Sequence, residues 1–274
     1  MIEILLSVYN GEKYLQEQID SILSQTYKDW NLLVRDDGSK DRSLDIIKEY
    51  VTKYPDKIRI HTDSFGNVGV KRSFELLLEA SNSEYFMFCD QDDFWLPNKI
   101  ELSYNQIKLD ESSLGSDVPL LVHTDLSIVN QNLEDVGLSM YKTLKAYPKK
   151  IKSNKHIPFI AYLVTGCTIL GNKKLKEVSL PFPEDIDLHD VWVFRKAILS
   201  NGNVSSLYDK TILYRQHQCN VRGASKSKQT LKDKLTINKQ AFQIYNKYVP
   251  NSNIITFIYW KVNYFFYRLL NKEC

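Results

Sequence analysis

Short apolar runs alternate with amphipathic stretches along the first 130 residues of the chain. The apolar runs have the length of buried strands, and the stretches between them repeat apolar residues every three to four positions, as helices do. The predicted strands are 2–8, 32–35, 58–60, 85–89 and 120–129, and the predicted helices begin near Leu15 and cover 41–54, 74–80 and 97–109. This order predicts an α/β fold with a doubly wound, mostly parallel sheet and right-handed crossovers.

The pattern changes in the second half of the chain. Residues 142–158 are basic and lack periodicity, which predicts a loop, whereas 190–199 has a helical pattern that ends at Asn201-Gly202. Residues 211–216 indicate a strand or an extended segment, and beyond Ser225 the chain is lysine-rich and helical. We expect a main domain over 1–225, with halves 1–110 and 111–225, and a helical C-terminal extension over 226–274.

Acidic residues follow the predicted strands at the points where the strands end. Asp90-Gln91-Asp92-Asp93 comes directly after the run 85–89, and Asp36-Asp37 comes after 32–35. A buried strand cannot hide adjacent anions, so these carboxylates should project from its carboxyl end, where open α/β sheets bind ligands. Oxygen ligands at that edge suit a hard divalent cation that also binds substrate phosphates. The alternative is an acidic turn leading into the helix that begins at Pro97.

Composition and charge exclude some classes of protein. The chain has 274 residues, of which 43% are hydrophobic and 25% charged, and its net charge of +3 is too small to argue for nucleic acid. Its four cysteines form no CxxC pair, so zinc and a disulfide framework are not indicated. The start shows no secretory signal, and no run reaches 18 apolar residues. We expect a protein of the reducing cytoplasm, and a peripheral position on the inner face of the plasma membrane stays open.

Three segments of the first hundred residues together resemble family 2 glycosyltransferases of GT-A fold. Ser7-Val8-Tyr9-Asn10-Gly11 resembles the opening strand and turn of that family, and Val34-Arg35-Asp36-Asp37-Gly38-Ser39 resembles its "VDDGS" segment. Asp90-Gln91-Asp92-Asp93 resembles its DxD motif. The resemblance implies an activated nucleotide-sugar donor and inversion at the anomeric carbon.

Segments of the second half resemble the bacterial rhamnosyltransferase-like branch of this family. They are Thr165-Gly166-Cys167-Thr168, His189-Asp190-Val191-Trp192 and Tyr214-Arg215-Gln216-His217 followed by Asn220-Val221. The chain departs from the branch pattern at Val191, where a second aromatic residue is usual, and at Gln218-Cys219, where Gly-Asn is usual. The resemblance implies transfer of L-rhamnose from dTDP-rhamnose to a cell-surface polysaccharide or lipid-linked glycan.

The resemblance also assigns roles in catalysis. It implies that Asp190 is the general base, which a poorly nucleophilic sugar hydroxyl requires; a helix cap is the alternative for this residue. It implies that Asp92 is a direct ligand of Mg²⁺ or Mn²⁺, a cation that stabilises a leaving nucleoside diphosphate. His217 lies where related enzymes carry a histidine that completes the metal shell, and a structural hydrogen bond is the alternative. We expect Trp192 to pack rather than to stack on an acceptor sugar.

Further candidates concern the nucleotide-sugar donor. Asp37 matches the acid that accepts the base N3–H of uracil or thymine, and Ser7 and Tyr9 would line the same pocket. The resemblance implies that Asp90 and Asp93 support the ribose, the donor sugar or a water near the metal. Gln91, between them, is assigned to the same nucleotide-sugar site.

Three charged residues near these motifs have open assignments. Lys71 could reach the base or a phosphate, or it could be a solvated surface lysine. Arg222 could clamp the pyrophosphate on a flexible lid, since guanidinium suits phosphate oxygens. For Asp36, stabilisation of a turn and direct contact with the donor both remain open.

Other functions remain possible from sequence alone. The same fold could use a UDP-hexose or a UDP-N-acetylhexosamine, or the chain could be a catalytically silent sugar-nucleotide-binding partner. A nucleotidyltransferase is disfavoured, because the turn after the first strand lacks a glycine-rich, basic phosphate loop.

The aromatic segment 254–270 carries Lys261 and Arg268 among seven aromatic residues. Aromatic-rich helices with basic flanks can lie in a membrane interface. The alternative is a helix that packs on the catalytic domain or on a dimer partner.

Overall fold

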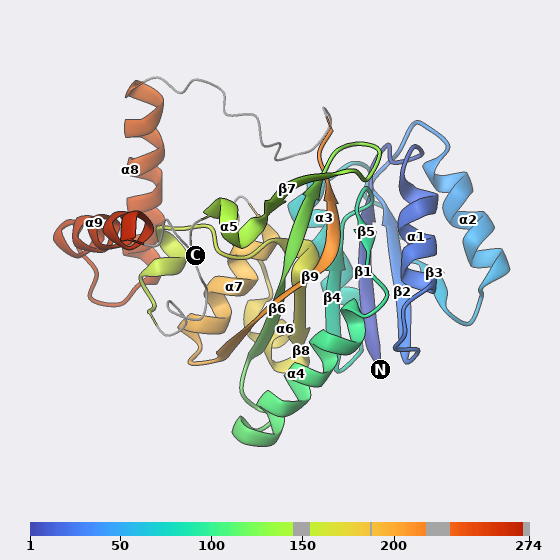
Figure 1. The fold of residues 1–274 in the computed structure, drawn as a ribbon, viewed down its shortest axis with the longest axis horizontal. Helices are drawn as coiled ribbons and strands as arrows, with labels where there is room; N and C mark the ends of the chain where they lie inside the picture. The colour runs from blue at the N-terminus through green and yellow to red at the C-terminus, as the bar shows by residue number, and fades with distance from the viewer. Residues whose placement is uncertain (145–153, 187, 218–230, 271–274) are drawn as a thin grey trace.

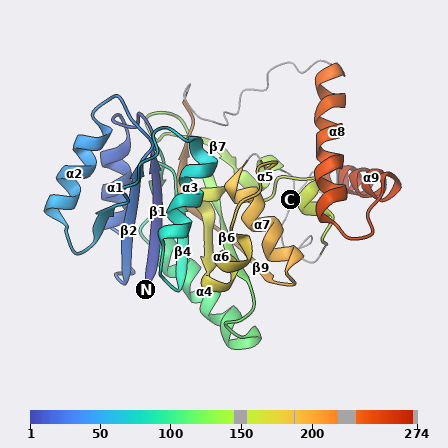
Figure 2. The same ribbon diagram turned by 180° about the vertical axis from the view of Figure 1, so that it is seen from behind.

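A mixed sheet of nine strands forms the centre of the computed structural model, which describes residues 1–144, 154–186, 188–217 and 231–270 (Figure 1). The strand order is β3-β2-β1-β4-β8-β6-β9-β5, and β7 pairs with β6 outside this path. The strands are β1 (Ile2–Val8), β2 (Trp30–Asp36), β3 (Ile58–Ile60), β4 (Tyr85–Cys89), β5 (Phe94–Trp95), β6 (Leu120–Val129), β7 (Asp135–Ser139), β8 (Ile169–Asn172) and β9 (Asn203–Arg215). Helices lie on both faces of this sheet, which confirms the predicted α/β class (Figures 1 and 2).

The first four strands follow the predicted parallel arrangement. β1 pairs in parallel with β2 and with β4, and β2 pairs in parallel with β3. The observed strands β1, β3, β4 and β6 have the bounds expected from their apolar runs. Because these strands are parallel, their carboxyl ends meet at one edge of the sheet, where the acidic segments begin.

The second half of the sheet is less regular than predicted. β8 runs antiparallel to both of its neighbours, β4 and β6, while β6 and β9 are parallel. A Cβ at Gly171 in β8 would lie 2.4 Å from the ring of Phe86, so only glycine allows β8 to pass this side chain. The expectation of a mostly parallel sheet therefore holds for β1–β4, and the sheet as a whole is mixed.

Helices on the two faces enclose two apolar clusters. The helices are α1 (Leu15–Leu23), α2 (Ser43–Lys53), α3 (Gly69–Ala80), α4 (Lys99–Leu114), α5 (Met140–Leu144), α6 (Lys173–Ser179), α7 (His189–Leu199), α8 (Leu231–Tyr248) and α9 (Ile254–Leu270). In β1, Ile4 and Leu6 join the cluster that α1, α2 and α4 cover, and Leu5 joins the cluster that α3 and α7 cover. This alternation follows from the two-residue period of a strand with both faces buried.

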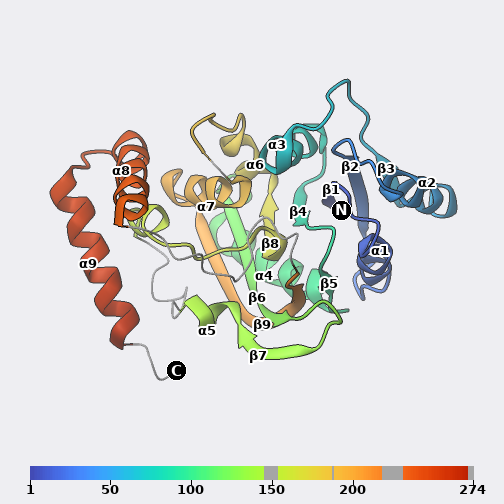
Figure 3. The same ribbon diagram turned by 90° about the horizontal axis from the view of Figure 1, so that it is seen from above.

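The helical C-terminal extension consists of α8 and α9, at one end of the molecule (Figure 3). Phe257 of α9 is buried with Tyr245 and Val249 around Phe159. None of the described helices is both long and apolar enough to cross a lipid bilayer. In the region expected to be a loop, 142–158, the structure has the end of α5 and the start of a short 3-10 helix at Ile157–Phe159, and 145–153 lies outside the described residues.

Candidate active site

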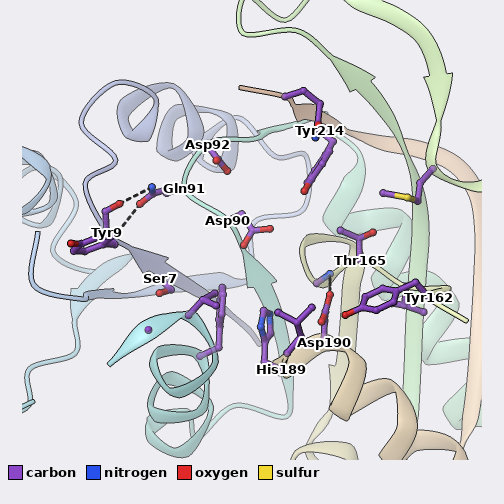
Figure 4. A pocket seen from close by; sticks show the side chains of 18 of the residues that line it. Ser7, Tyr9, Asp90, Gln91, Asp92, Tyr162, Thr165, His189, Asp190 and Tyr214 are labelled. Atoms are coloured by element: carbon purple, nitrogen blue, oxygen red, sulfur yellow. Dashed lines mark hydrogen bonds between the residues drawn. The ribbon is translucent and has the colours of Figure 1, made fainter. Parts of the chain in front are cut away.

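A cavity of about 650 Å³ opens at the carboxyl ends of β1, β2 and β4. Seven of the residues expected to form the site line it, namely Ser7, Tyr9, Asp37, Asp90, Gln91, Asp92 and Asp190. They come from four elements or their ends that are far apart in the sequence, and Figure 4 shows the acids around one space. The topology of the sheet therefore brings the predicted acidic segments together.

Asp190 lies on α7, across the cavity from the acids that follow β4 (Figure 4). Its Oδ2 accepts a hydrogen bond from the Gly166 amide at 3.0 Å, and its Oδ1 accepts one from the Val191 amide at 2.7 Å. Both amides and the positive end of the α7 dipole stabilise an anion at this position. A carboxylate has about four acceptor sites, so Asp190 can still accept the proton of an alcohol.

The carboxylate of Asp92 meets His217, which follows β9. His217 Nε2 and Asp92 Oδ2 are 2.8 Å apart. Adjacent ligands of one octahedral cation at ~2.1 Å are about 3 Å apart, so this pair has a spacing that a shared Mg²⁺ or Mn²⁺ accepts. His217 is not among the residues that line the cavity. Its ring lies against that of Tyr14, with the two ring centroids 5.0 Å apart.

Arg215 fixes the turn that carries these acids. Its Nε donates to the Asp92 carbonyl at 2.9 Å, and its backbone amide donates to Oδ1 of Asp93 at 3.3 Å. Its guanidinium also pairs with Glu17 and lies 4.3 Å from the ring centroid of Tyr14. Sequence reasoning assigned no role to Arg215, although a buried arginine at the end of a strand indicates a fixed acidic partner.

Asp93 is fully buried and does not face the cavity. Ligand atoms of Asp90, Asp93 and Cys167 lie within 4.8 Å of one another. Burial raises the pKa of Cys167, which keeps it a thiol, and a thiol suits a hard cation poorly. Burial, together with the charges of Asp92 and Asp190, raises the pKa of Asp90 to about 7. Asp92 with His217 is therefore the better ligand pair for a hard cation.

A buried cation lies behind this cluster. Lys99 is fully buried, and its ammonium lies 4.4 Å over the ring of Trp95 without a hydrogen-bond partner among the described residues. Burial lowers the pKa of Lys99 to about 8, while the nearby Cys167, Cys89 and Asp93 act in the opposite direction. The acids of the DxD segment thus have a positive charge beneath them.

The β2 side of the cavity, which we define as Ser7, Arg35 and Asp37, is a closed network. Arg35 is buried and pairs with both Asp37 and Asp63. The amides of Val68 and Gly69 donate to the two oxygens of Asp37 at 2.9 Å each. Ser7 and Ser73 share a hydrogen bond of 2.7 Å. Asp37 thus holds the loop before α3, and its Oδ2 retains capacity for one further donor.

Gln91 joins the first strand to the acidic segment. Its Oε1 accepts from the Tyr9 amide at 2.7 Å, and its Nε2 donates to the Tyr9 carbonyl at 3.0 Å (Figure 4). The side chain also packs where a Cβ at Gly11 would lie, 2.6 Å from Oε1. Gln91 therefore positions Tyr9 and the turn after β1 as well as lining the cavity.

Two further candidates lie away from the cavity or outside the description. The ammonium of Lys71 donates to the carbonyls of Pro183 and Glu184, at 3.4 and 3.0 Å, and the side chain is absent from the cavity lining. Arg222 lies outside the described residues. Asp36 accepts from the amides of Gly38 and Ser39, at 3.2 and 3.0 Å, as expected for a residue that stabilises a turn.

We define the α7 side of the cavity as Asp90, His189 and Asp190. Unlike the β2 side, it contains buried polar atoms without a hydrogen-bond partner among the described residues. His189 stacks on Phe74 with ring centroids 4.0 Å apart and meets Phe88 edge-on at 4.7 Å. Only 5% of its surface is exposed, and both ring nitrogens lack a hydrogen-bond partner among the described residues. Burial lowers the pKa of His189 to about 4, so the ring is neutral at pH 7 and carries one N–H. Trp192 packs as expected and donates to the Ser179 carbonyl at 2.7 Å.

The wall opposite the acids is mainly apolar. Its residues come from β6, α5 and the segment before β8, and they are Ile128, Met140, Leu144, Tyr162 and Val164. Sequence reasoning assigned none of them to the site, because an apolar residue that lines a cavity has the same sequence signal as one in the core. A mostly apolar cavity with a few convergent polar groups is typical of small-molecule sites.

Comparisons with known proteins relate the chain to glycosyltransferases. Residues 3–120 match the family model described as Glycosyl transferase family 2. An uncharacterized glycosyltransferase of Rickettsia typhi is 32% identical over 195 residues, which cover 69% of this chain and 57% of the relative. The dTDP-rhamnosyl transferase RfbG of Shigella flexneri is 29% identical over 224 residues, which cover 80% of this chain and 74% of the relative. The chain thus spans little more than half of the Rickettsia protein.

Among solved structures, the mannosyltransferase PcManGT from Pyrobaculum calidifontis, in complex with GDP-Man and Mn²⁺, has a TM-score of 0.60. Its sequence is 16% identical, and the match covers 80% of this chain and 58% of that one. At this identity the likeness shows the fold alone. Residues 3–120 thus match glycosyl transferase family 2, and the fold of the described chain is GT-A-like.

Proposed function

We propose that the protein is a metal-dependent, inverting glycosyltransferase that moves L-rhamnose from dTDP-rhamnose to a cell-surface polysaccharide or lipid-linked glycan. The similarity to a dTDP-rhamnosyl transferase over 80% of the chain supports this donor. The observation that carries the reaction type is the placement of Asp190 in the same cavity as Asp90 and Asp92. A base and a diphosphate site must face each other across the sugar if the anomeric carbon is to be inverted.

Asp190 would act on the acceptor. Its carboxylate, held by two backbone amides, takes the proton of the acceptor hydroxyl as the hydroxyl oxygen bonds to the anomeric carbon. The bond between that carbon and the diphosphate oxygen breaks on the opposite face, and the nucleoside diphosphate leaves with the electron pair. The fixed orientation of Asp190 provides the positioning that such an attack needs.

Asp92 and His217 would hold the divalent cation, with Arg215 fixing the backbone of Asp92. Bound there, Mg²⁺ or Mn²⁺ would offset the charge that develops on the leaving diphosphate. Ser7, Tyr9 and Asp37 would receive the base, and the free capacity of Asp37 suits the N3–H of thymine or uracil. Asp90 would position the ribose and the donor sugar directly. Gln91 would do so through Tyr9, and Asp93 through Arg215. Lys71 and Arg222 stay candidates for phosphate contact.

A donor screen followed by a matched pair of variants tests this proposal. Nucleotide sugars are first ranked by thermal stabilisation with Mn²⁺, where dTDP-rhamnose should give the largest shift; a larger shift with a UDP-hexose or UDP-N-acetylhexosamine would replace the donor but keep the reaction. Asp190→Asn should then lower kcat by about 10³-fold or more and leave calorimetric binding of the donor unchanged. Full turnover in this variant would reject Asp190 as the base.

The metal site has its own test. Asp92→Ala should weaken Mn²⁺-dependent binding of dTDP by about 100-fold without changing binding in the presence of a chelator. Asp117→Ala, at an exposed position, is the matched control. Equal Mn²⁺-dependent affinities for the two variants would contradict the ligand assignment.

A further inference from the structure

Helix α9 has one face packed on the domain and a wider face in solvent. Phe257 is buried, and Trp260, Tyr264 and Tyr267 are partly buried against the domain. The exposed large apolar side chains are Ile254, Ile255, Ile258, Tyr259, Val262, Phe265, Phe266, Leu269 and Leu270. At roughly 100° per residue they cover a continuous sector of about 160°. Figure 3 shows α9 along the outer edge of the molecule.

This exposed sector, which we call the α9 face, is too apolar to be an ordinary surface. Ile255 is 75% exposed and Leu270 is 85% exposed. Scattered apolar residues are normal on a protein surface, but a contiguous patch marks a site of interaction. The packing of the opposite side of α9 shows that the helix is docked on the domain, so the α9 face is presented by a fixed helix.

The charged side chains of α9 itself are all positive. Lys261 and Arg268 lie together on one flank of the sector at the same helical spacing, and Ile254–Leu270 contains no acidic residue. A second copy of the chain would bring a like-charged flank to this face, whereas an anionic surface complements it.

A groove between α8 and α9 adjoins the face. It has a volume of about 480 Å³, its apolar lining includes Phe242, Phe257 and Ile258, and Lys239 and Lys261 stand beside these residues. Apolar walls with cationic side chains at the edge suit an acyl chain next to a phosphate headgroup. Tyr259, which is exposed on α9, is of the residue type that is enriched at the boundary between hydrocarbon and headgroups.

We propose that the α9 face lies in the headgroup region of an anionic lipid bilayer and holds the domain on that surface. The helix lies parallel to the surface, with its apolar sector in the boundary layer and Lys261 and Arg268 at the phosphates. This inference is independent of the donor and of the proposed transfer reaction, because lipid binding is measured without substrate.

Vesicle flotation of the full chain tests the proposal. Wild type should float with phosphatidylcholine–phosphatidylglycerol vesicles. The floating fraction should be at least about fivefold lower with vesicles of phosphatidylcholine alone. Ile255→Glu/Phe266→Glu should lower partitioning by at least about tenfold. Leu109→Glu/Leu114→Glu, at leucines of α4 that are 63% and 49% exposed, is the matched control and should bind as wild type does. Arg268→Gln should weaken binding to the anionic vesicles only.

Folding and oligomeric state are checked alongside. Both double variants change exposed positions and should keep the thermal midpoint of wild type. Equal flotation of wild type and Ile255→Glu/Phe266→Glu would overturn the proposal. So would absence of lipid binding together with a wild-type dimer that this variant dissociates, because the α9 face would then belong to a second copy.

Discussion

The β2 side and the α7 side of the cavity differ in how their polar groups are satisfied. On the β2 side, Arg35 and Asp37 are buried and paired with each other, with Asp63 and with backbone amides. On the α7 side, both ring nitrogens of His189 lack a hydrogen-bond partner among the described residues. The same sheet edge thus carries one side whose buried polar groups are paired and one side where some of them are not.

This difference concerns the contribution of each side to the stability of the fold. A buried polar group without a partner costs about 1–3 kcal/mol, whereas a satisfied network makes its loop rigid. Under the proposed function, the β2 side would hold the nucleotide in a preformed pocket. The α7 side would keep polar atoms for groups that arrive with the substrates, at the expense of stability.

The largest expected effect is on stability at the β2 side. Asp37→Asn removes the charge that faces the buried Arg35 and should lower the free energy of unfolding by about 3–5 kcal/mol. Urea denaturation measures this loss. Asp63→Asn is the control, because Asp63 is more exposed and should cost less than Asp37 does. A loss of under 1 kcal/mol for Asp37→Asn would show that the β2 network is not what holds this side.

Removal of the buried Lys99 should change the free energy of unfolding in the opposite direction, toward higher stability. The folded-state pKa of Lys99 is about 8 against an ordinary 10.5, so between these values the unfolded chain binds more protons than the folded protein. The free energy of unfolding therefore falls as pH drops from 10.5 to 8, by up to about 3 kcal/mol. Lys99→Met should abolish this slope and raise stability at pH 7.

Urea midpoints from pH 7 to pH 10 measure the effect. Lys174→Met, at a half-buried lysine that pairs with Glu177 at the surface, is the control and should keep the wild-type slope. Parallel curves for wild type and Lys99→Met would show that the buried ammonium of Lys99 does not lower the free energy of unfolding.

The sequence predicted the parts of the fold that continuous apolar runs encode. Ile2–Val8 and Tyr85–Cys89 are buried throughout or nearly so, and their patterns mark them as central strands. β7 was missed because Asp135–Ser139 is mostly exposed and has no apolar pattern. β8 was missed because it is four residues long and ends in Gly171-Asn172. Short strands like these depend on their neighbours and not on their own propensity.

For the site, position at strand ends was predictable and pairing was not. Ser7, Asp37 and Asp92 were expected at one edge of the sheet because parallel strands end there. The contacts of Arg215 with Asp92 and Asp93 join residues more than 120 positions apart and depend on the register of β9. The isolation of His189 is likewise a property of the tertiary structure, since the sequence shows only a histidine before an acid.

The smallest expected effect, and the sharpest test of the comparison, is at His189. His189→Phe keeps the stack on Phe74 and removes two unsatisfied nitrogens, so the thermal midpoint should rise. If the ring nitrogens serve a sugar hydroxyl, kcat/KM for transfer should fall by about tenfold while nucleotide binding at the β2 side is unchanged. His189→Gln, which restores a donor and an acceptor, should recover part of the activity and lose the gain in stability. If His189→Phe is more stable and fully active, the unpaired ring nitrogens of His189 only lower stability. The difference between the two sides would then play no role in sugar transfer.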